Sequence, residues 1–339
     1  MTQRTTQSDP TIGKTITDTA AERPRTTTDA AISMRQLVPV LDTELLGAEG
    51  TFAPSPTPVR ERTFANSNFK RFYVPSKAPI FQHELLHSVN TVIELYARRL
   101  NPTLDQETIN QGVNEFMGRM QHDAFSDNDA LEHNVNAVGE YLWTSAKKHK
   151  ILNYMELCSI LNAVIRDDIE EEIQAAVIVF RCINSGRVTR ERAISIDEQS
   201  YPRGGETWRG GGFREEHKTF FRSIKGKKYR VPGFLATSNQ QSVAAAFVHK
   251  CNTGNPVAMW RVKFDKRGKK KPQYRVQHMS LVSKTMIEGE HEYLFAPYSV
   301  FTLISVEWSK KLTKPHQFTI FAASDNREED EHLPLAPWY

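Results

Sequence analysis

The chain has 339 residues, with 44 Lys and Arg against 40 Asp and Glu, and a net charge of +4 at pH 7. That length allows about two domains, or one large domain with tails. The net charge is too small to favour a nucleic-acid partner by itself.

Three widely spaced cysteines, Cys158, Cys182 and Cys251, favour a reducing compartment over a disulfide framework. The chain has no run of about 18 apolar residues, so we expect no membrane span. The N-terminus lacks the apolar core of a signal peptide. We therefore expect an intracellular, cytoplasmic protein, with unconventional export as the alternative. We also expect a monomer.

Residues 1–70 are rich in Thr, Ser, Pro and Arg and poor in large apolar residues. Such a segment buries too little surface to offset the entropy lost on ordering, which predicts a flexible tail. Ile32 to Leu46 is the part of it where we expect a short helix or a docking segment.

Apolar residues recur at helical spacing from Pro79 onward, which predicts an all-helical lobe over residues 79–184. The first helix is expected to end at Asn101-Pro102. Further helices are expected over Gln106 to Gln121, over Ala130 to Lys148, and twice within Asn153 to Ile183.

Short strand patterns with turn signals follow over residues 185–324, and one helix is expected among them. This arrangement predicts an α+β domain over residues 71–324 with a mostly antiparallel core. An acidic and aromatic tail, residues 325–339, is expected to pack back on it. The predicted strands are Tyr229 to Ala236, Val257 to Phe264, Tyr274 to His278, Tyr293 to Val306 with a bend at Pro297, and Gln317 to Ala323, and the predicted helix is Gln241 to His249.

The run His83-Glu84-Leu85-Leu86-His87 spells HExxH, the helix motif of zinc proteases. On a helical wheel, His83 and His87 fall opposite the apolar stripe. The pattern therefore favours two surface histidines, with a zinc protease as the alternative.

Two segments offer groups suited to an anionic ligand. In Trp208-Arg209-Gly210-Gly211, a guanidinium fork precedes glycines whose backbone a ligand can approach closely, the alternative being a flexible turn. The segment Leu235-Ala236-Thr237-Ser238 ends a predicted strand in hydroxyls, and Ser238 is expected to cap the helix that carries Phe247.

An acidic stretch, Glu288 to Glu292, enters the strand that Pro297 breaks. In an extended chain, Glu290 and Glu292 point to one face. Two carboxylates so placed repel and tend to take different roles. The alternative is an ordinary acidic loop. Two basic runs, Lys225 to Lys228 and Lys266 to Lys271, are interpreted as solvated hairpin tips, with binding of an acidic surface or nucleic-acid backbone as the alternative.

The order of these motifs resembles the arginine-serine-glutamate class of mono-ADP-ribosyltransferases over about Ile173 to Ile304. The resemblance implies an NAD cleft between two small sheets beside a helical lobe. It also implies transfer of ADP-ribose from NAD to an arginine of a protein acceptor, with release of nicotinamide and without a metal.

Carried over by position, Glu292 would be the catalytic glutamate and Glu290 would orient the acceptor arginine. Arg209 would hold a phosphate or ribose of NAD. The resemblance places the remaining site residues around NAD as follows: Gly210 with its backbone groups at the nicotinamide amide, Thr237 and Ser238 along the ribose and bracing the acid, and Gly211 and Phe247 in the NAD-binding set.

Two departures from the family pattern leave alternatives open. Ala236 stands where the family usually has the first Ser of Ser-Thr-Ser, so one hydroxyl that supports the catalytic glutamate is missing. Arg181 is a rival to Arg209 for the arginine role. The alternatives are an NAD glycohydrolase, with water as acceptor, and an NAD-binding module without catalysis.

Overall fold

The computed structural model describes residues 62–73, 80–125, 135–184, 200–251, 256–282, 292–311 and 314–337. The helix predicted within Ile32 to Leu46 and the acid Glu290 lie outside these residues. Folded structure begins earlier than predicted, because Phe69 and Tyr73 are fully buried and belong to a short helix. None of the described helices is both long enough and apolar enough to cross a membrane.

The helical lobe is built around one apolar cluster to which all its helices contribute. Helix α3 contacts α7 along its length and buries the predicted stripe, including Leu85, Val89 and Tyr96. The predicted helices are all present, although the third is shorter than expected. The lobe helices are α2 (Asn68–Tyr73), α3 (Gln82–Leu100), α4 (Gln106–Phe125), α5 (Val135–Thr144), α6 (Leu157–Asp167) and α7 (Glu170–Asn184).

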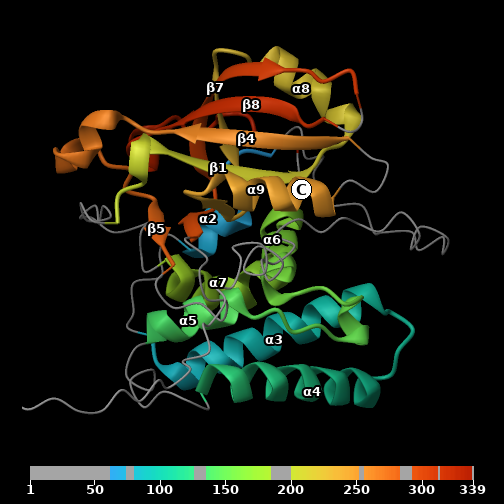
Figure 1. Ribbon diagram of the computed structural model, residues 1–339. Coiled ribbons are helices and arrows are strands. Elements are labelled where there is room, and N and C mark those ends of the chain that lie inside the picture. Colours follow the sequence, from blue (N-terminus) through green and yellow to red (C-terminus); the bar gives the residue numbers. More distant parts are fainter. Residues whose placement is uncertain are drawn as a thin grey trace, which may run out of the picture.

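The described strands form one eight-stranded sheet in the order β2-β7-β8-β4-β1-β3-β6-β5. Every neighbouring pair is antiparallel except β4 and β8, which confirms the α+β, mostly antiparallel prediction. Figure 1 shows the sheet above the helical lobe, with α9 lying under β1. The elements are β1 (Glu206–Gly212), α8 (Lys218–Ser223), β2 (Lys228–Val231), β3 (Leu235–Ser238), α9 (Gln241–Lys250), β4 (Val257–Lys263), β5 (Met279–Leu281), β6 (Glu292–Phe295), β7 (Ser299–Glu307) and β8 (His316–Ala322).

The sheet is nearly divided in two between β1 and β3. These strands share a single register pair, Trp208 with Ser238, whereas β1 and β4 share seven. Five strands, from β2 to β1, lie on one side of this split, and β3, β6 and β5 lie on the other. The two small sheets that we expected are therefore two parts of one sheet, joined by a single pair of residues.

The two parts of the sheet face each other. Only residues 232–234 join β2 to β3, a reach of about 14 Å for an extended chain. A flat sheet would separate these strands by five steps, or about 24 Å. The sheet therefore curves, and Phe295 of β6 meets Phe301 of β7 with ring centroids 5.1 Å apart. The second apolar cluster fills the space between the two facing parts of the sheet.

Several expectations for the β core were wrong. The single strand expected over Tyr229 to Ala236 is divided between β2 and β3, on opposite sides of the split. The alternative of a flexible glycine turn is also wrong, since Gly210 to Gly212 end strand β1. Residues 272–274 form a turn of 3-10 helix, and the strand expected over Tyr274 to His278 begins later, at Met279. Ser238 does not occupy the N-cap of α9, which is Gln240.

The chain returns to the domain after β8. The backbone NH of Arg230 donates to the Pro334 carbonyl, and that of Ala336 donates to the Arg230 carbonyl. Residues 334–336 therefore lie beside β2, and the side chain of Arg230 donates to carbonyls of Tyr298 and Glu329.

Candidate active site

A row of three residues crosses the split in the sheet. Trp208 on β1 is paired with Ser238 on β3, and Ser238 is paired with Glu292 on β6. Residues paired across antiparallel strands project to the same face. The side chains of Ser238 and Glu292 therefore lie together on the face toward the helical lobe, where Ala236 and Leu294 join the lobe's apolar cluster.

Glu292 is held by a residue of the helical lobe. Its side chain is buried, with 2% exposed, and its Oε1 accepts a hydrogen bond of 3.1 Å from Nε1 of Trp143. Trp143 lies on α5, is fully buried, and packs against Phe234 with ring centroids 4.8 Å apart. Because packing against Phe234 holds the indole in place, its hydrogen bond gives the Oε1 atom of Glu292 a defined position.

Arg209 reaches the same strands from the other face. Its partner on β4 is Trp260, which belongs to the cluster inside the curved sheet. The guanidinium Nη1 donates to the Ala236 carbonyl at 2.9 Å, across the point where β1 and β3 separate. The side chain is 6% exposed, so a buried cation lies at the split, beside the strand that carries Ser238.

Thr237 and Ser238 do not share a face, because successive residues of a strand alternate. Thr237 is paired with Tyr293, and its Oγ1 donates to the Tyr293 carbonyl at 3.2 Å. Ser238 Oγ accepts from the Gln240 backbone NH at 3.1 Å, bracing the entry to α9. The expectation that both hydroxyls line one ribose does not match this alternation, and only Ser238 lies on the face of Glu292.

Gly210 and Phe247 are both explained by the packing of α9. A Cβ at Gly210 would lie 1.9 Å from the Ala244 carbonyl oxygen, so only glycine permits α9 to pack this close to β1. Phe247 lies on α9 with 7% exposed and packs with Val243. Gly211 pairs with Ala258 inside the sheet.

Arg181 and the HExxH residues lie in the helical lobe, away from the split. Glu290 is outside the described residues, and Arg181 lies in the last turn of α7 in the helical lobe. The HExxH glutamate, Glu84, accepts from the Phe81 backbone NH at 2.9 Å and caps helix α3. His83 and His87 are exposed on that helix, in agreement with the predicted surface histidines.

Ala236, the departure from the family pattern, is paired with Leu294 and not with Glu292. The hydroxyl residue directly across from Glu292 is Ser238. The sequence analysis did not identify Trp143, because a tryptophan in an apolar helix usually indicates a core residue. Its hydrogen-bond partner, Glu292, is also 149 residues away in the sequence.

No family model and no curated protein matches the sequence. Several solved structures have a similar fold. Among them are the ADP-ribosyltransferase Vis of Vibrio splendidus with an inhibitor (16% identity, 66% of this chain and 88% of that one, TM-score 0.36), the ADP-ribosyltransferase HopU1 of Pseudomonas syringae pv. Tomato (12%, 76% and 95%, 0.37), and exoenzyme S of Pseudomonas aeruginosa with carba-NAD and human 14-3-3 protein beta (13%, 63% and 86%, 0.39). These are likenesses of overall fold at low sequence identity.

Proposed function

We propose that the chain transfers ADP-ribose from NAD to an arginine side chain of a protein acceptor and releases nicotinamide. One observation carries the proposal: Ser238 and Glu292 are paired across β3 and β6, while the Arg209 guanidinium reaches β3 at the Ala236 carbonyl. The motifs that resemble the family thus come from neighbouring strands at one split in the sheet. Their groups fit NAD, since a cation suits the phosphates and a carboxylate suits a ribose hydroxyl.

Glu292 is the proposed catalytic residue. Breaking the bond between ribose C1′ and the nicotinamide nitrogen sends the electron pair to nicotinamide and builds positive charge on the sugar, as in glycoside cleavage. A fixed carboxylate beside the sugar stabilises that charge more in the transition state than in the ground state. Its burial, with 2% exposed, strengthens the electrostatic effect because water screens it less.

Trp143 supplies a hydrogen bond to Glu292, where the family pattern has a supporting hydroxyl. Its indole NH donates to Oε1 of Glu292 at 3.1 Å, which leaves Oε2 for the ribose hydroxyl. We assign Trp143 as a positioning residue, since it acts through Glu292.

The acceptor step needs a second acid. A guanidinium nitrogen of the acceptor attacks C1′, and a proton must then leave that nitrogen. Glu290, two residues before Glu292, is the proposed group that orients the acceptor and takes the proton. Arg209 and Ser238 are the proposed contacts to the phosphate and ribose of NAD, with Gly210, Gly211, Thr237 and Phe247 forming the surrounding strands and helix.

The test uses the full chain with NAD labelled in the adenylate part and agmatine as an arginine-like acceptor. Glu292→Gln should abolish labelling of agmatine, a loss of at least about a thousandfold, because the carboxylate charge is removed at the developing cation. Glu307→Gln is the matched control, an exposed glutamate on strand β7, and should label normally. Equal labelling by both variants would reject the proposal.

Glu290→Gln separates transfer from hydrolysis. Under the proposal, agmatine labelling falls while nicotinamide release persists with water as acceptor. If the unaltered chain releases nicotinamide at the same rate with and without agmatine and labels nothing, the protein is an NAD glycohydrolase. NAD binding without nicotinamide release would identify an NAD-binding module.

A further inference from the structure

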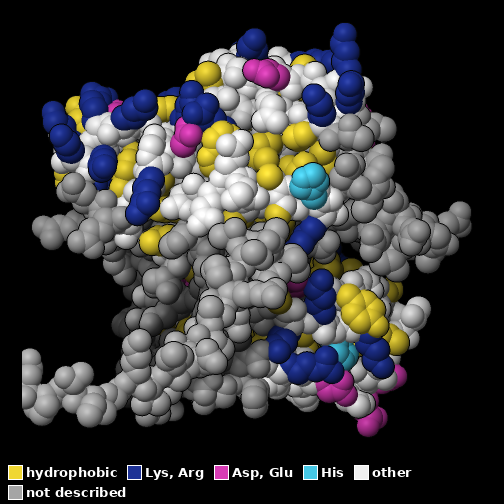
Figure 2. Space-filling view, in the orientation of Figure 1, with side chains coloured by type: hydrophobic (Ala, Val, Ile, Leu, Met, Phe, Trp, Pro, Cys, Tyr) yellow, Lys and Arg dark blue, Asp and Glu magenta, His cyan; other side chains and the backbone are white. Residues whose placement is uncertain are grey.

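A cavity lies at the end of the β core, away from the split. It has a volume of about 470 Å³ and is lined by residues of α8, of the turn before it, and of the β7–β8 hairpin. Figure 2 shows Lys and Arg side chains gathered at the upper right of the molecule, where these elements lie in Figure 1. The volume is in the range typical of small-molecule sites.

Five cations and one carboxylate line this cavity among the described residues, and the carboxylate pairs with Lys218, which leaves four cations in excess. The cations are Lys218, Arg222, Lys310, Lys311 and Lys314, and the carboxylate is Glu215. Like charges gathered in one place repel. The excess positive charge therefore favours an anionic occupant.

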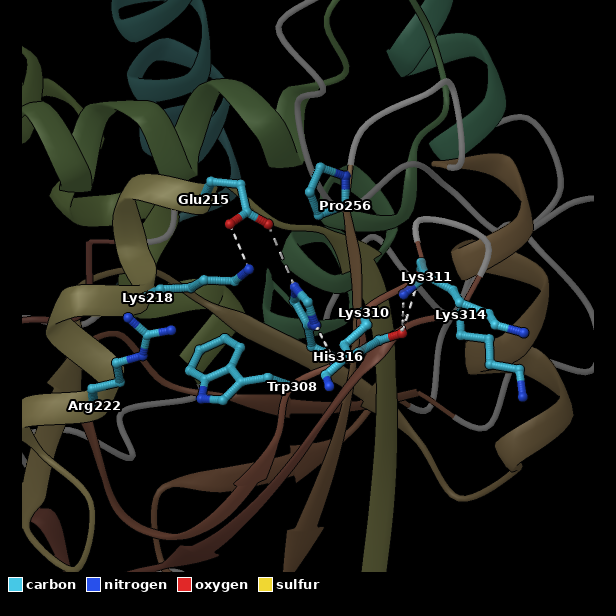
Figure 3. Close-up of a pocket in the computed structure, with 10 residues that line it drawn as sticks. Glu215, Lys218, Arg222, Pro256, Trp308, Lys310, Lys311, Lys314 and His316 are labelled. Atoms are coloured by element: carbon cyan, nitrogen blue, oxygen red, sulfur yellow. Dashed lines mark hydrogen bonds and ion pairs between the residues drawn. The ribbon is translucent and has the colours of Figure 1, made fainter.

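The cations come from two sides, as Figure 3 shows. On one side, Lys218 and Arg222 lie one turn apart on α8, with Nζ and Cζ at 5.5 and 5.6 Å from the Trp308 ring centroid. The lysines of the hairpin lie on the other side. Because the indole holds two of the cations in place, part of the site is formed before a ligand binds.

His316 adds a buried donor to the cavity. It is 3% exposed, and its Nδ1 accepts from the Ser309 backbone NH at 2.9 Å. Burial lowers the pKa of His316 below its usual range, so the ring is neutral at pH 7 and carries its proton on Nε2. That nitrogen has no hydrogen-bond partner among the described residues, since the nearest Glu215 oxygen is 3.7 Å away.

We propose that this cavity binds a compact polyphosphate, a small molecule that bears two or more phosphate groups. Phosphate oxygens accept from guanidinium, ammonium and imidazole NH groups alike, which matches the whole set of donors. Two or more phosphates can meet the cations of α8 and those of the hairpin at the same time. The proposal is independent of the transferase function.

Isothermal titration of the full chain with inorganic tripolyphosphate tests the site. We expect binding of one molecule per chain, weakened when NaCl rises from about 0.05 M to about 0.3 M, because salt screens exposed charges. Adenosine triphosphate and inositol hexakisphosphate are then compared, so that a nucleotide source and an inositol source of the phosphates are distinguished.

The double variant Arg222→Gln/Lys311→Gln removes one exposed cation from each side of the cavity. It should weaken tripolyphosphate binding about tenfold or more, since each charge-assisted bond contributes to affinity. The matched control is Lys269→Gln/Lys270→Gln, which removes the same charge from the exposed Lys266 to Lys271 run outside the cavity. It should bind within about twofold of the unaltered chain, because its charges are distant and screened.

Three outcomes would overturn the proposal. The first is the absence of heat with every polyphosphate at low salt. The second is equal weakening in both double variants, which would mean that overall charge alone attracts the anion. The third is binding of a single-stranded RNA oligonucleotide while tripolyphosphate fails to bind, which would identify an extended nucleic-acid surface.

Discussion

The two faces of strands β1, β3 and β6 differ in what they hold. The face toward the helical lobe carries Ser238 and Glu292, with Trp143 of α5 on the acid. The face inside the curved sheet carries Thr237 and Tyr293, whose contacts are internal to the core. Arg209 starts on this inner face and reaches β3 only where the sheet is split.

This difference shows how the motif residues are divided. Neighbours in sequence, such as Thr237 and Ser238, lie on opposite faces because strands alternate. Residues far apart in sequence, such as Trp143 and Glu292, share one face. Among the residues of β3 and β6, we therefore expect substitutions on the lobe-facing side to impair chemistry and substitutions on the inner side to lower stability.

The largest effect is expected at Gly210, on the lobe-facing side. Gly210→Ala places a Cβ 1.9 Å from the Ala244 carbonyl oxygen, and the resulting overpacking should lower the free energy of unfolding by about 3 kcal/mol. Gly212→Ala is the control on the same face, where a Cβ meets nothing within 4 Å. Chemical denaturation measures both. Equal losses would mean that the α9 contact does not set the glycine requirement.

A pH test is available next to the inner cluster, because the buried His278 packs against Phe295 with ring centroids 5.9 Å apart. Burial lowers the pKa of His278 from 6.5 to about 3, against the opposing pull of Asp325 and with a small further lowering by Arg230. The unfolded chain binds a proton at His278 below pH 6.5 and the folded chain does not, so stability is lost as pH falls from about 6.5 toward about 3. From pH 6.5 to pH 5 this loss is about 2 kcal/mol.

His278→Gln should flatten this dependence in urea unfolding measured across that pH range. His332→Gln, at an exposed histidine, should keep the slope of the unaltered chain. A slope unchanged by His278→Gln would assign the acid sensitivity to other groups.

Trp143→Phe tests the contact that crosses from lobe to sheet. It keeps an aromatic ring against Phe234 but removes the donor to Glu292. We expect kcat for ADP-ribose transfer to fall about tenfold, because one oriented hydrogen bond is lost, while KM for NAD changes little. Phe234→Leu loosens the same packing but keeps the donor, so it should lower kcat clearly less than Trp143→Phe. Equal falls in kcat for the two variants would assign Trp143 a packing role only.

The smallest effects are expected when the two hydroxyl residues of β3, Thr237 and Ser238, are substituted and compared. Ser238→Ala should lower transfer several-fold to about tenfold, since a polar contact to NAD is lost. Thr237→Val should leave transfer unchanged and lower the free energy of unfolding by about 1 kcal/mol, because its bond to the Tyr293 carbonyl is lost. Radiolabel transfer and thermal unfolding of both variants check this, and the reverse pattern would mean that the faces are misassigned.

Periodicity predicted the helical lobe well, because long amphipathic helices such as α3 carry their apolar stripe in the local sequence. The bend between β6 and β7 was also predicted correctly, since Pro297 interrupts the strand pattern there. Strand β1 was missed because glycines usually indicate turns. The reason for Gly210 is a helix that follows 31 residues later, a long-range contact that no local pattern encodes.

The site was predictable only in part for the same reason. The order of Arg209, Ser238 and Glu292 along the chain suggested that they belong together. Their division between two faces depends on strand register, which is set by pairing between distant segments. The cavity at Trp308 draws its cations from α8 and the β7–β8 hairpin, whereas the basic run around Arg267 is paired locally with Asp265.

The two short connectors, residues 232–234 and 296–298, each run from one part of the sheet to the other. Since β2 and β3 are consecutive in sequence and on opposite sides of the split, neither part is a continuous piece of chain. The shortest continuous fragment that holds β3, β5 and β6, residues 235–295, also removes β4 from the other part of the sheet. We therefore expect the β core to melt in one cooperative step, in which the candidate acid and guanidinium lose their positions together.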